Sequence, residues 1–209
     1  MKKVIIAVLA VLMVTPAFAN NWGVGLKLGG GQNNPKGMKD LKDAGIANRT
    51  ELDENGGIFG LEAMYEFNLN DEANKLGVKV GWDYYGENKL ELKDIIGLGV
   101  SETIKEETYA FPFTVYYKRD NGVKNFSWFG GAGVTIIHTK VDGEGVAVGD
   151  DSKTKVFPHI VAGGEYRFTE VFALGLEARY NISAKVKKDG AVYSNRSGFG
   201  AALTGRFYF

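Results

Sequence analysis

The sequence contains no cysteine, and this absence excludes several function classes at once. Without thiols the chain has no disulfides, zinc ribbons, iron–sulfur clusters or thiol nucleophile. Proline is scarce, with four residues, whereas glycine is abundant, with 29 of 209. This combination fits many turns and tight strand packing better than disorder. Net charge is missing as well, since 25 Lys and Arg balance 25 Asp and Glu. A neutral chain has no bulk attraction for polyanions, so no nucleic-acid partner is predicted.

Apolar runs long enough to span a membrane as a helix are also missing. The longest apolar run belongs to an export signal. Residues 4–14 are uninterrupted apolar residues, too few to span a bilayer as a helix. Lys2 and Lys3 precede the run, and the small residues Ala17 and Ala19 follow it at the positions that a signal peptidase reads. We therefore predict a cleaved signal peptide over residues 1–19 and a single domain over residues 20–209.

Beyond residue 20 the dominant pattern is period-two alternation of large apolar and polar side chains. It recurs in eight segments, at about residues 22–31, 57–69, 76–86, 104–118, 126–138, 155–168, 171–181 and 197–209. Such alternation is typical of a sheet with two chemically different faces. Pro112 and Pro158 fall inside these segments, and because proline donates no backbone hydrogen bond we expect a bulge at each.

Charged side chains lie on the polar register of these segments, with nearly balanced sign. A solvated face has no need of this balance, whereas an enclosed interior must pair its charges. We therefore predict a charge network inside a closed sheet, made of six cations and five anions: Lys27, Lys79, Lys118, Arg167, Arg179, Arg206, Glu62, Glu66, Asp83, Glu165 and Glu177.

The connections between the segments alternate in length. Those after the odd-numbered segments run about 25, 17, 16 and 15 residues, and those after the even-numbered ones about 6, 7 and 2. Long loops at one end and short turns at the other are typical of outer-membrane barrels, in which the long loops are extracellular. Each segment is long enough to supply the roughly 9–11 residues that a tilted strand needs to cross a bilayer, where a sheet must close on itself. The fold predicted is all-β: an eight-stranded antiparallel up-and-down transmembrane β-barrel.

Four stretches resemble the small outer-membrane β-barrel superfamily, which has porin-like members of the OmpA, OmpX and OmpW type. They are residues 111–118, residues 163–168, the strand at 175–180, and the end of the chain, where Phe207 and Phe209 resemble the superfamily's C-terminal signature. The resemblance implies integral insertion in the outer membrane after export through the periplasm. It also implies contact with outer-membrane lipids, including lipopolysaccharide, and recognition of Phe207 and Phe209 by the barrel-assembly machinery.

Catalytic chemistry has little support in the sequence. Barrel enzymes that act on the acyl chains of lipopolysaccharide need a serine activated by a histidine, in one subgroup within a His-x-Ser-Asn run. His138 is followed by Thr139 and His159 by Ile160, so neither matches. No catalytic residue and no cofactor are predicted.

The third long connection is acidic, with Asp142, Glu144, Asp150 and Asp151 among glycines. Carboxylates on a flexible loop are ligands for hard cations, but this spacing does not match the twelve-residue calcium loop. A solvated acidic loop is the favoured interpretation, and no metal site is predicted.

These observations favour a non-enzymatic outer-membrane protein that acts in envelope structure and in surface interaction through four extracellular loops, with an unknown extracellular ligand possible. Three alternatives stay open. The first is a narrow conduit for small or hydrophobic solutes, with a wall thinned at residues 130–133. The others are a lipid-modifying enzyme and a soluble periplasmic barrel with its two registers exchanged.

Overall fold

The computed structural model describes residues 22–31, 34–45, 47–54, 56–69, 73–95, 99–120, 122, 125–144, 151–188 and 191–209. The predicted signal peptide, with Ala17 and Ala19, lies outside these residues. Within the described ranges, no helix is long and apolar enough to cross a membrane.

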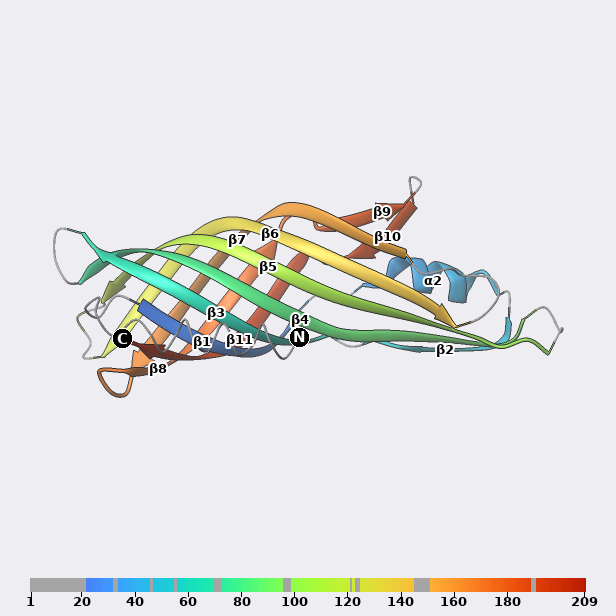
Figure 1. Ribbon diagram of the computed structural model, residues 1–209, viewed down its shortest axis with the longest axis horizontal. Coiled ribbons are helices and arrows are strands. Elements are labelled where there is room, and N and C mark those ends of the chain that lie inside the picture. Colours follow the sequence, from blue (N-terminus) through green and yellow to red (C-terminus); the bar gives the residue numbers. More distant parts are fainter. Residues whose placement is uncertain are drawn as a thin grey trace, which may run out of the picture.

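Eight antiparallel strands close into a barrel, as predicted (Figure 1). Each strand pairs with its neighbours in chain order, and pairing of the last strand with the first completes the circle. The barrel strands are β1 (Trp22–Gly31), β3 (Gly57–Asn68), β4 (Asn74–Ile95), β5 (Glu102–Asp120), β6 (Phe126–Glu144), β7 (Asp151–Arg167), β8 (Phe172–Asn181) and β11 (Gly198–Tyr208). The end of β11 lies at the end of the barrel that carries the three short turns (Figure 1).

Four further elements lie at the opposite end, which we call the long end. Helix α2 (Lys36–Asp43) and strand β2 (Ala47–Asp53) come from the first long connection, and β2 pairs with the last part of β4. Strands β9 (Lys185–Lys188) and β10 (Ala191–Asn195) form a separate hairpin in the last one.

The second and third long connections are much shorter than predicted, because β4 to β7 continue far beyond the barrel. The segment predicted as a loop from residue 87 continues β4 as far as Ile95. Its apolar and polar side chains alternate as regularly as those of the barrel strands. Here, however, the apolar side chains point inward and the charged ones outward. Leu90 and Leu92 are buried, whereas Lys89 and Lys93 are partly exposed.

A β-bulge marks the point where the polarity changes. The register between β4 and β5 shifts between Tyr84 and Glu87, and Gly86 has a φ of 76°. Before the bulge the apolar side chains of β4 point outward, as with Val80, which is 46% exposed. After it they point inward, since the extra residue reverses which positions face which side.

The strand ends beyond the bulge, together with α2 and β2, form a unit that we call the extension (residues 36–45, 47–53, 87–95, 102–107 and 140–144). It contains a buried apolar cluster, and α2 packs against this cluster through Met38 and Leu41. The other members are Leu90, Leu92, Ile104 and Val141, with Ala47, Leu52 and Ile95 partly buried around them.

The prediction of a β-bulge at each of the two prolines is wrong. Pro112 pairs with Thr135, and Pro158 with Val134, in ladders that keep their register. On its other side Pro112 lies between the β4–β5 pairs Val80–Phe113 and Asp83–Ala110, at a position without a described pair. The missing N–H is thus accommodated without a bulge.

Candidate functional site

The two faces of the barrel have opposite chemistry. Large apolar side chains point outward, for example Leu176 and Leu203, which are 58% and 67% exposed. Their neighbour Glu177 points inward and is 2% exposed. Of the eleven predicted network residues, ten are buried: Lys27, Glu62, Glu66, Lys79, Asp83, Lys118, Glu165, Glu177, Arg179 and Arg206.

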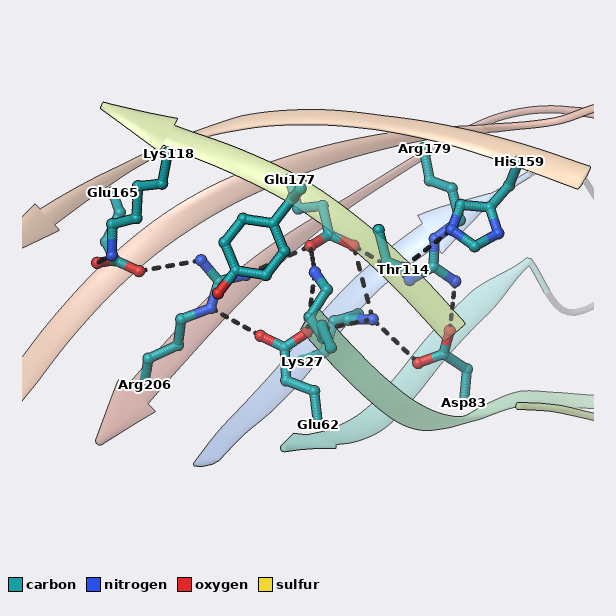
Figure 2. A network of polar contacts seen from close by, with 12 residues as sticks. Lys27, Glu62, Asp83, Thr114, Lys118, His159, Glu165, Glu177, Arg179 and Arg206 are labelled. Atoms are coloured by element: carbon teal, nitrogen blue, oxygen red, sulfur yellow. Dashed lines mark hydrogen bonds and ion pairs between the residues drawn. The ribbon is translucent and has the colours of Figure 1, made fainter. Parts of the chain in front are cut away.

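Glu177 on β8 lies at the centre of the buried charges (Figure 2). Its carboxylate pairs with four cations, Lys27 at 3.6 Å, Arg179 at 3.1 Å, Arg206 at 3.3 Å and Lys79. Lys27 comes from β1 and Lys79 from β4, so these contacts cross the interior of the barrel.

Two other carboxylates link the same cations. Asp83 accepts hydrogen bonds from Arg179 at 2.7 Å and from Lys27 at 3.1 Å. Glu62 accepts one from Arg206 Nε at 2.7 Å and lies 3.3 Å from Lys79 Nζ. Each charge of this central group therefore has a partner of opposite sign, which a charge removed from water requires.

A second group of charges lies toward the short-turn end. Lys118 donates hydrogen bonds to Glu165 at 2.7 Å and to Glu66 at 3.1 Å. Arg206 also pairs with Glu165 at 3.0 Å and thereby connects this group to Glu177. The pairs form one continuous network along the interior.

Arg167 differs from the other ten predicted residues because it is only half-buried. Its guanidinium lies 4.4 Å from the ring centre of Tyr208, a cation–π contact. Tyr208 donates a hydrogen bond to Glu165 at 2.7 Å, so Arg167 lies beside the network at its short-turn end.

A third buried group, at the long end, is absent from the sequence prediction. Arg196 is fully buried between β10 and β11, and its Nη2 donates to Glu106 and to Thr108, both at 3.1 Å. Ser194 also donates to Glu106, at 3.1 Å, and Arg196 lies over the ring of Tyr85. Glu106 falls on the polar register of the predicted strand at 104–118, and that position is the sequence signal for an inward-pointing charge. Arg196 lies in a predicted loop, where no register applies.

Both histidines are hydrogen-bonded to threonines. The ring of buried His159 lies 3.0 Å from Thr114 Oγ1 (Figure 2). It also lies 2.8 Å from Thr135 Oγ1. The ring of His138 lies 2.9 Å from Thr154 Oγ1. In the part of the chain that the structure describes, neither histidine is hydrogen-bonded to a serine.

Most of the acidic third connection lies outside the described residues, including Asp150 and the side chains of Glu144 and Asp151. Asp142 accepts a hydrogen bond from Lys140 at 2.7 Å. No group of three metal-ligating side chains occurs among the described residues.

The two C-terminal phenylalanines lie on the outward face. Phe207 is 46% exposed and its ring packs against Phe172, with 5.0 Å between ring centres. Phe209 is 49% exposed, and its N–H donates to the carbonyl of Trp22. The final strand thus meets the first strand where the barrel closes.

A closed sheet with an apolar exterior and a charged interior defines an integral β-barrel membrane protein. The chain matches the family model described as "Outer membrane protein beta-barrel domain" over residues 4–207, and it belongs to that family. It is therefore an integral protein of the outer membrane.

Several solved structures are similar to this chain at low sequence identity. The attachment invasion locus protein Ail of Yersinia pestis is 17% identical, with a TM-score of 0.50, over 91% of this chain and 99% of that one. Neisserial surface protein A is 14% identical, over 90% and 95% of the two chains, with a TM-score of 0.49. The outer membrane enzyme PagL is 13% identical, over 90% and 98%, with a TM-score of 0.41. No curated protein matches the chain.

Proposed function

We propose that this protein is a non-enzymatic component of the outer membrane, in which a closed barrel holds the extension at the cell surface for interaction with other molecules. The observation that carries the proposal is the continuous network of buried ion pairs around Glu177. An eight-stranded barrel has an interior just wide enough to be filled by its own side chains. Here those side chains are paired with one another.

Aromatic side chains add to the filling. A Cβ on Gly77 would meet the buried ring of Tyr116 at 2.2 Å, and Tyr116 also packs against Phe129. Gly131 and Gly133 lie against the backbone of β5, where a Cβ would meet carbonyl oxygens at 2.3 and 1.8 Å. These glycines support close strand packing, so we favour a closed wall over the conduit alternative.

The long end is proposed to face the exterior, by analogy with other outer-membrane barrels. There the outer face of the extension carries partly exposed charges of alternating sign. Glu51 lies 2.7 Å from Arg49, and Glu91 lies 2.6 Å from Lys89 and 3.2 Å from Lys93. Hydrogen bonds from Lys89 and Lys93 lower the pKa of Glu91. We propose that lipopolysaccharide head groups or an extracellular ligand contact this face.

Phe207 and Phe209 are proposed as the signal for the barrel-assembly machinery, because they lie outward on the strand that closes the barrel. The absence of enzymatic activity is proposed from the threonine partners of His138 and His159. Incubation of the folded protein with lipopolysaccharide, followed by mass spectrometry of the acyl chains, tests this point, and altered chains would contradict it.

Single-channel recording in planar bilayers tests the closed lumen. The folded protein, identified by its heat-modifiable gel mobility, is expected to leave the bilayer silent. Discrete openings at neutral pH and moderate salt would contradict the proposal and favour a conduit.

A further inference from the structure

The outer face of the extension carries charges in rows of one sign. Arg49 on β2 lies directly opposite Lys93 on β4, and Glu51 lies directly opposite Glu91 in the same pair of strands. Like charges that face each other across a ladder are unfavourable. These four side chains, which we call the charge square, form an acidic row and, farther from the barrel, a basic row.

The ion pairs within the charge square run along the strands. Arg49 lies 2.7 Å from Glu51, and Lys93 lies 3.2 Å from Glu91. A longer contact of 3.7 Å joins Lys93 to Glu51 diagonally. The four side chains are between 29% and 73% exposed, and exposed ion pairs contribute little to stability. The charges therefore remain available to a partner.

A shallow hollow of about 410 Å³ lies beside the acidic row. Its lining consists of three carboxylates, one cation and one apolar side chain: Glu51, Asp53, Glu91, Lys89 and Leu52. Lys89 is paired with Glu91 at 2.6 Å, so the lining keeps an excess of negative charge. The hollow thus favours a cationic side chain from a partner.

Two copies in one membrane cannot pair through this face. Side by side, they hold their extensions parallel, so each row of one copy meets the same row of the other at the same height. Like charges then meet like charges, which is unfavourable between two surfaces.

An antiparallel copy reverses the order of the rows. A two-fold axis that runs between the rows and parallel to them places each basic row on the acidic row of the other copy. Arg49 then meets Glu51 of the second copy, and Lys93 meets its Glu91. Arg49 is the most exposed member of the charge square, at 73%, and it can enter the negatively charged hollow of the second copy. The charge square is therefore complementary to itself in this orientation.

The position of the charge square in the extension allows this arrangement. At about 3.3 Å per residue, Leu92 at its centre lies roughly 17 Å along β4 beyond Glu87, and β4 ends at Ile95, about 10 Å further. Two antiparallel extensions therefore overlap at their outer ends while the barrels stay apart. The two barrels lie at opposite ends of the pair, in two different membranes.

We propose that the charge square binds a second copy of this chain held in an opposed membrane, in an antiparallel contact between the two extensions. This inference rests on the proposed function, in which the extension lies outside the cell, and it names the partner of the outer face. A single contact is weak because its ion pairs are exposed, but many copies on two facing membranes act together.

Pairing of vesicles tests the proposal. The folded full-length protein is placed in two populations of phosphatidylcholine vesicles with different fluorescent lipids, and fluorescence cross-correlation measures the fraction of vesicles that diffuse as pairs. Pairs are expected when both populations carry the protein, and none when one is protein-free. Because salt screens exposed charges, about 0.5 M sodium chloride should reduce this fraction several-fold.

Exchange of the charges locates the contact. In an acid-to-base variant, Glu51→Lys and Glu91→Lys make both rows basic, and in a base-to-acid variant, Arg49→Glu and Lys93→Glu make both rows acidic. Each variant alone should form about tenfold fewer pairs, because like charges then meet. Vesicles with one variant should pair with vesicles that carry the other, which also shows that both variants are folded. Failure of this mixture to pair would refute the antiparallel contact.

A third variant controls for net charge. Lys89→Glu with Lys105→Glu changes the net charge by as much as the base-to-acid variant, but in a cross-strand pair nearer the barrel. Against the acid-to-base variant, it should form no more pairs than the wild type does. Pairing at the level of the base-to-acid variant would mean that net charge alone holds the vesicles together, and the inference would fall.

The orientation of the extension is measured separately, because the chain has no cysteine of its own. Ser101→Cys places one labelling site just before β5, and a membrane-impermeant maleimide reports its accessibility on cells and on vesicles. Accessible protein that forms no vesicle pairs would overturn this inference alone. A site that is inaccessible on cells would overturn the outward orientation as well.

Lipopolysaccharide is the competing partner for this face. Protein-free vesicles that contain lipopolysaccharide are mixed with vesicles that carry the protein. If these vesicles pair while two protein-bearing populations do not, the face binds a glycolipid and the second copy is refuted as its partner.

Discussion

The barrel and the extension are built from the same strands but have opposite interiors. In the barrel, β4 turns Lys79 and Asp83 inward and Val80 outward. In the extension, the same strand turns Leu90 inward and Lys89 outward. The side that becomes apolar is the one that meets hydrocarbon: lipid around the barrel, and the protein's own core in the extension. The medium on each side of the sheet, more than the strand itself, therefore decides whether the apolar or the polar side chains of a strand point inward.

The change of medium along β4 occurs within a few residues. Tyr84 on the outer face packs against Tyr109, with 5.3 Å between ring centres, and the bulge follows directly. Aromatic residues are enriched at the edges of membrane-spanning barrels. We therefore propose that the membrane surface lies at Tyr84 and Tyr109, with the extension beyond it in water.

The interiors of the barrel and of the extension also differ in how far each side chain depends on a specific partner. A buried ion pair requires both members, and removal of one leaves an uncompensated charge. An apolar core loses only the contacts of the side chain that is shortened. This difference leads to four predictions, in order of decreasing effect.

Glu177→Gln is expected to have the largest effect, since it removes the carboxylate shared by four cations. The cost is about 3–5 kcal/mol of unfolding free energy. Urea titration of the refolded barrel, followed by tryptophan fluorescence, measures it. Glu91→Gln, on the surface of the extension, is the matched control. If both variants were equally stable, the ion pairs around Glu177 would have no structural role.

Leu92→Ala is expected to loosen the extension while leaving the barrel folded. Truncation of a buried leucine costs about 2–5 kcal/mol, and here the loss falls on a core separate from the barrel. Hydrogen exchange at residues 36–53 should accelerate, while exchange within β8 and β11 stays unchanged. The control is Leu26→Ala, whose side chain is 51% exposed on the outer face of the barrel. A uniform acceleration would show that the two regions unfold as one unit.

Leu176→Arg places a charge on the lipid-facing side of the barrel and is expected to cost about 2–4 kcal/mol near the bilayer midplane. Thr103→Arg makes the same kind of change on the outer face of the extension, where a shift within about 0.5 kcal/mol is expected. Equilibrium unfolding in lipid vesicles compares the two. Similar costs would argue that the two regions share one medium.

The smallest expected effect concerns the surface charges of the extension. Because the pKa of Glu91 is lower in the folded state, its pairs stabilise the protein above the ordinary carboxylate range and lose this effect as the pH falls through the lowered pKa. Lys89→Gln should raise the pKa of Glu91 toward its ordinary value, and so should high salt. Nuclear magnetic resonance titration of the Glu91 side chain measures both changes. A pKa unaffected by either would contradict the contacts seen here.

Most of the barrel was predictable from local pattern, because alternation reports directly which side chains share a face. Glu62, Glu177 and Arg179 stand on the polar register of their strands, and all three are buried. Residues 88–93 continue the register of the barrel segment before them, since Leu90 and Leu92 stand at even positions like Val78 and Val80. What the sequence pattern does not show is the bulge between Tyr84 and Glu87, which turns that register from the outer face to the inner one.

Local pattern alone therefore determined that this chain forms eight two-faced strands, since a period of two follows from strand geometry at any position. Which cation meets which carboxylate depends on strands distant in sequence, as when Lys79 of β4 meets Glu177 of β8. That choice required closure of the barrel, because only closure brings those side chains within a few ångströms of each other. The position of Arg196 was likewise decided by tertiary structure: an irregular segment has no periodicity, and its side chain lies where the surrounding strands leave space and provide a carboxylate.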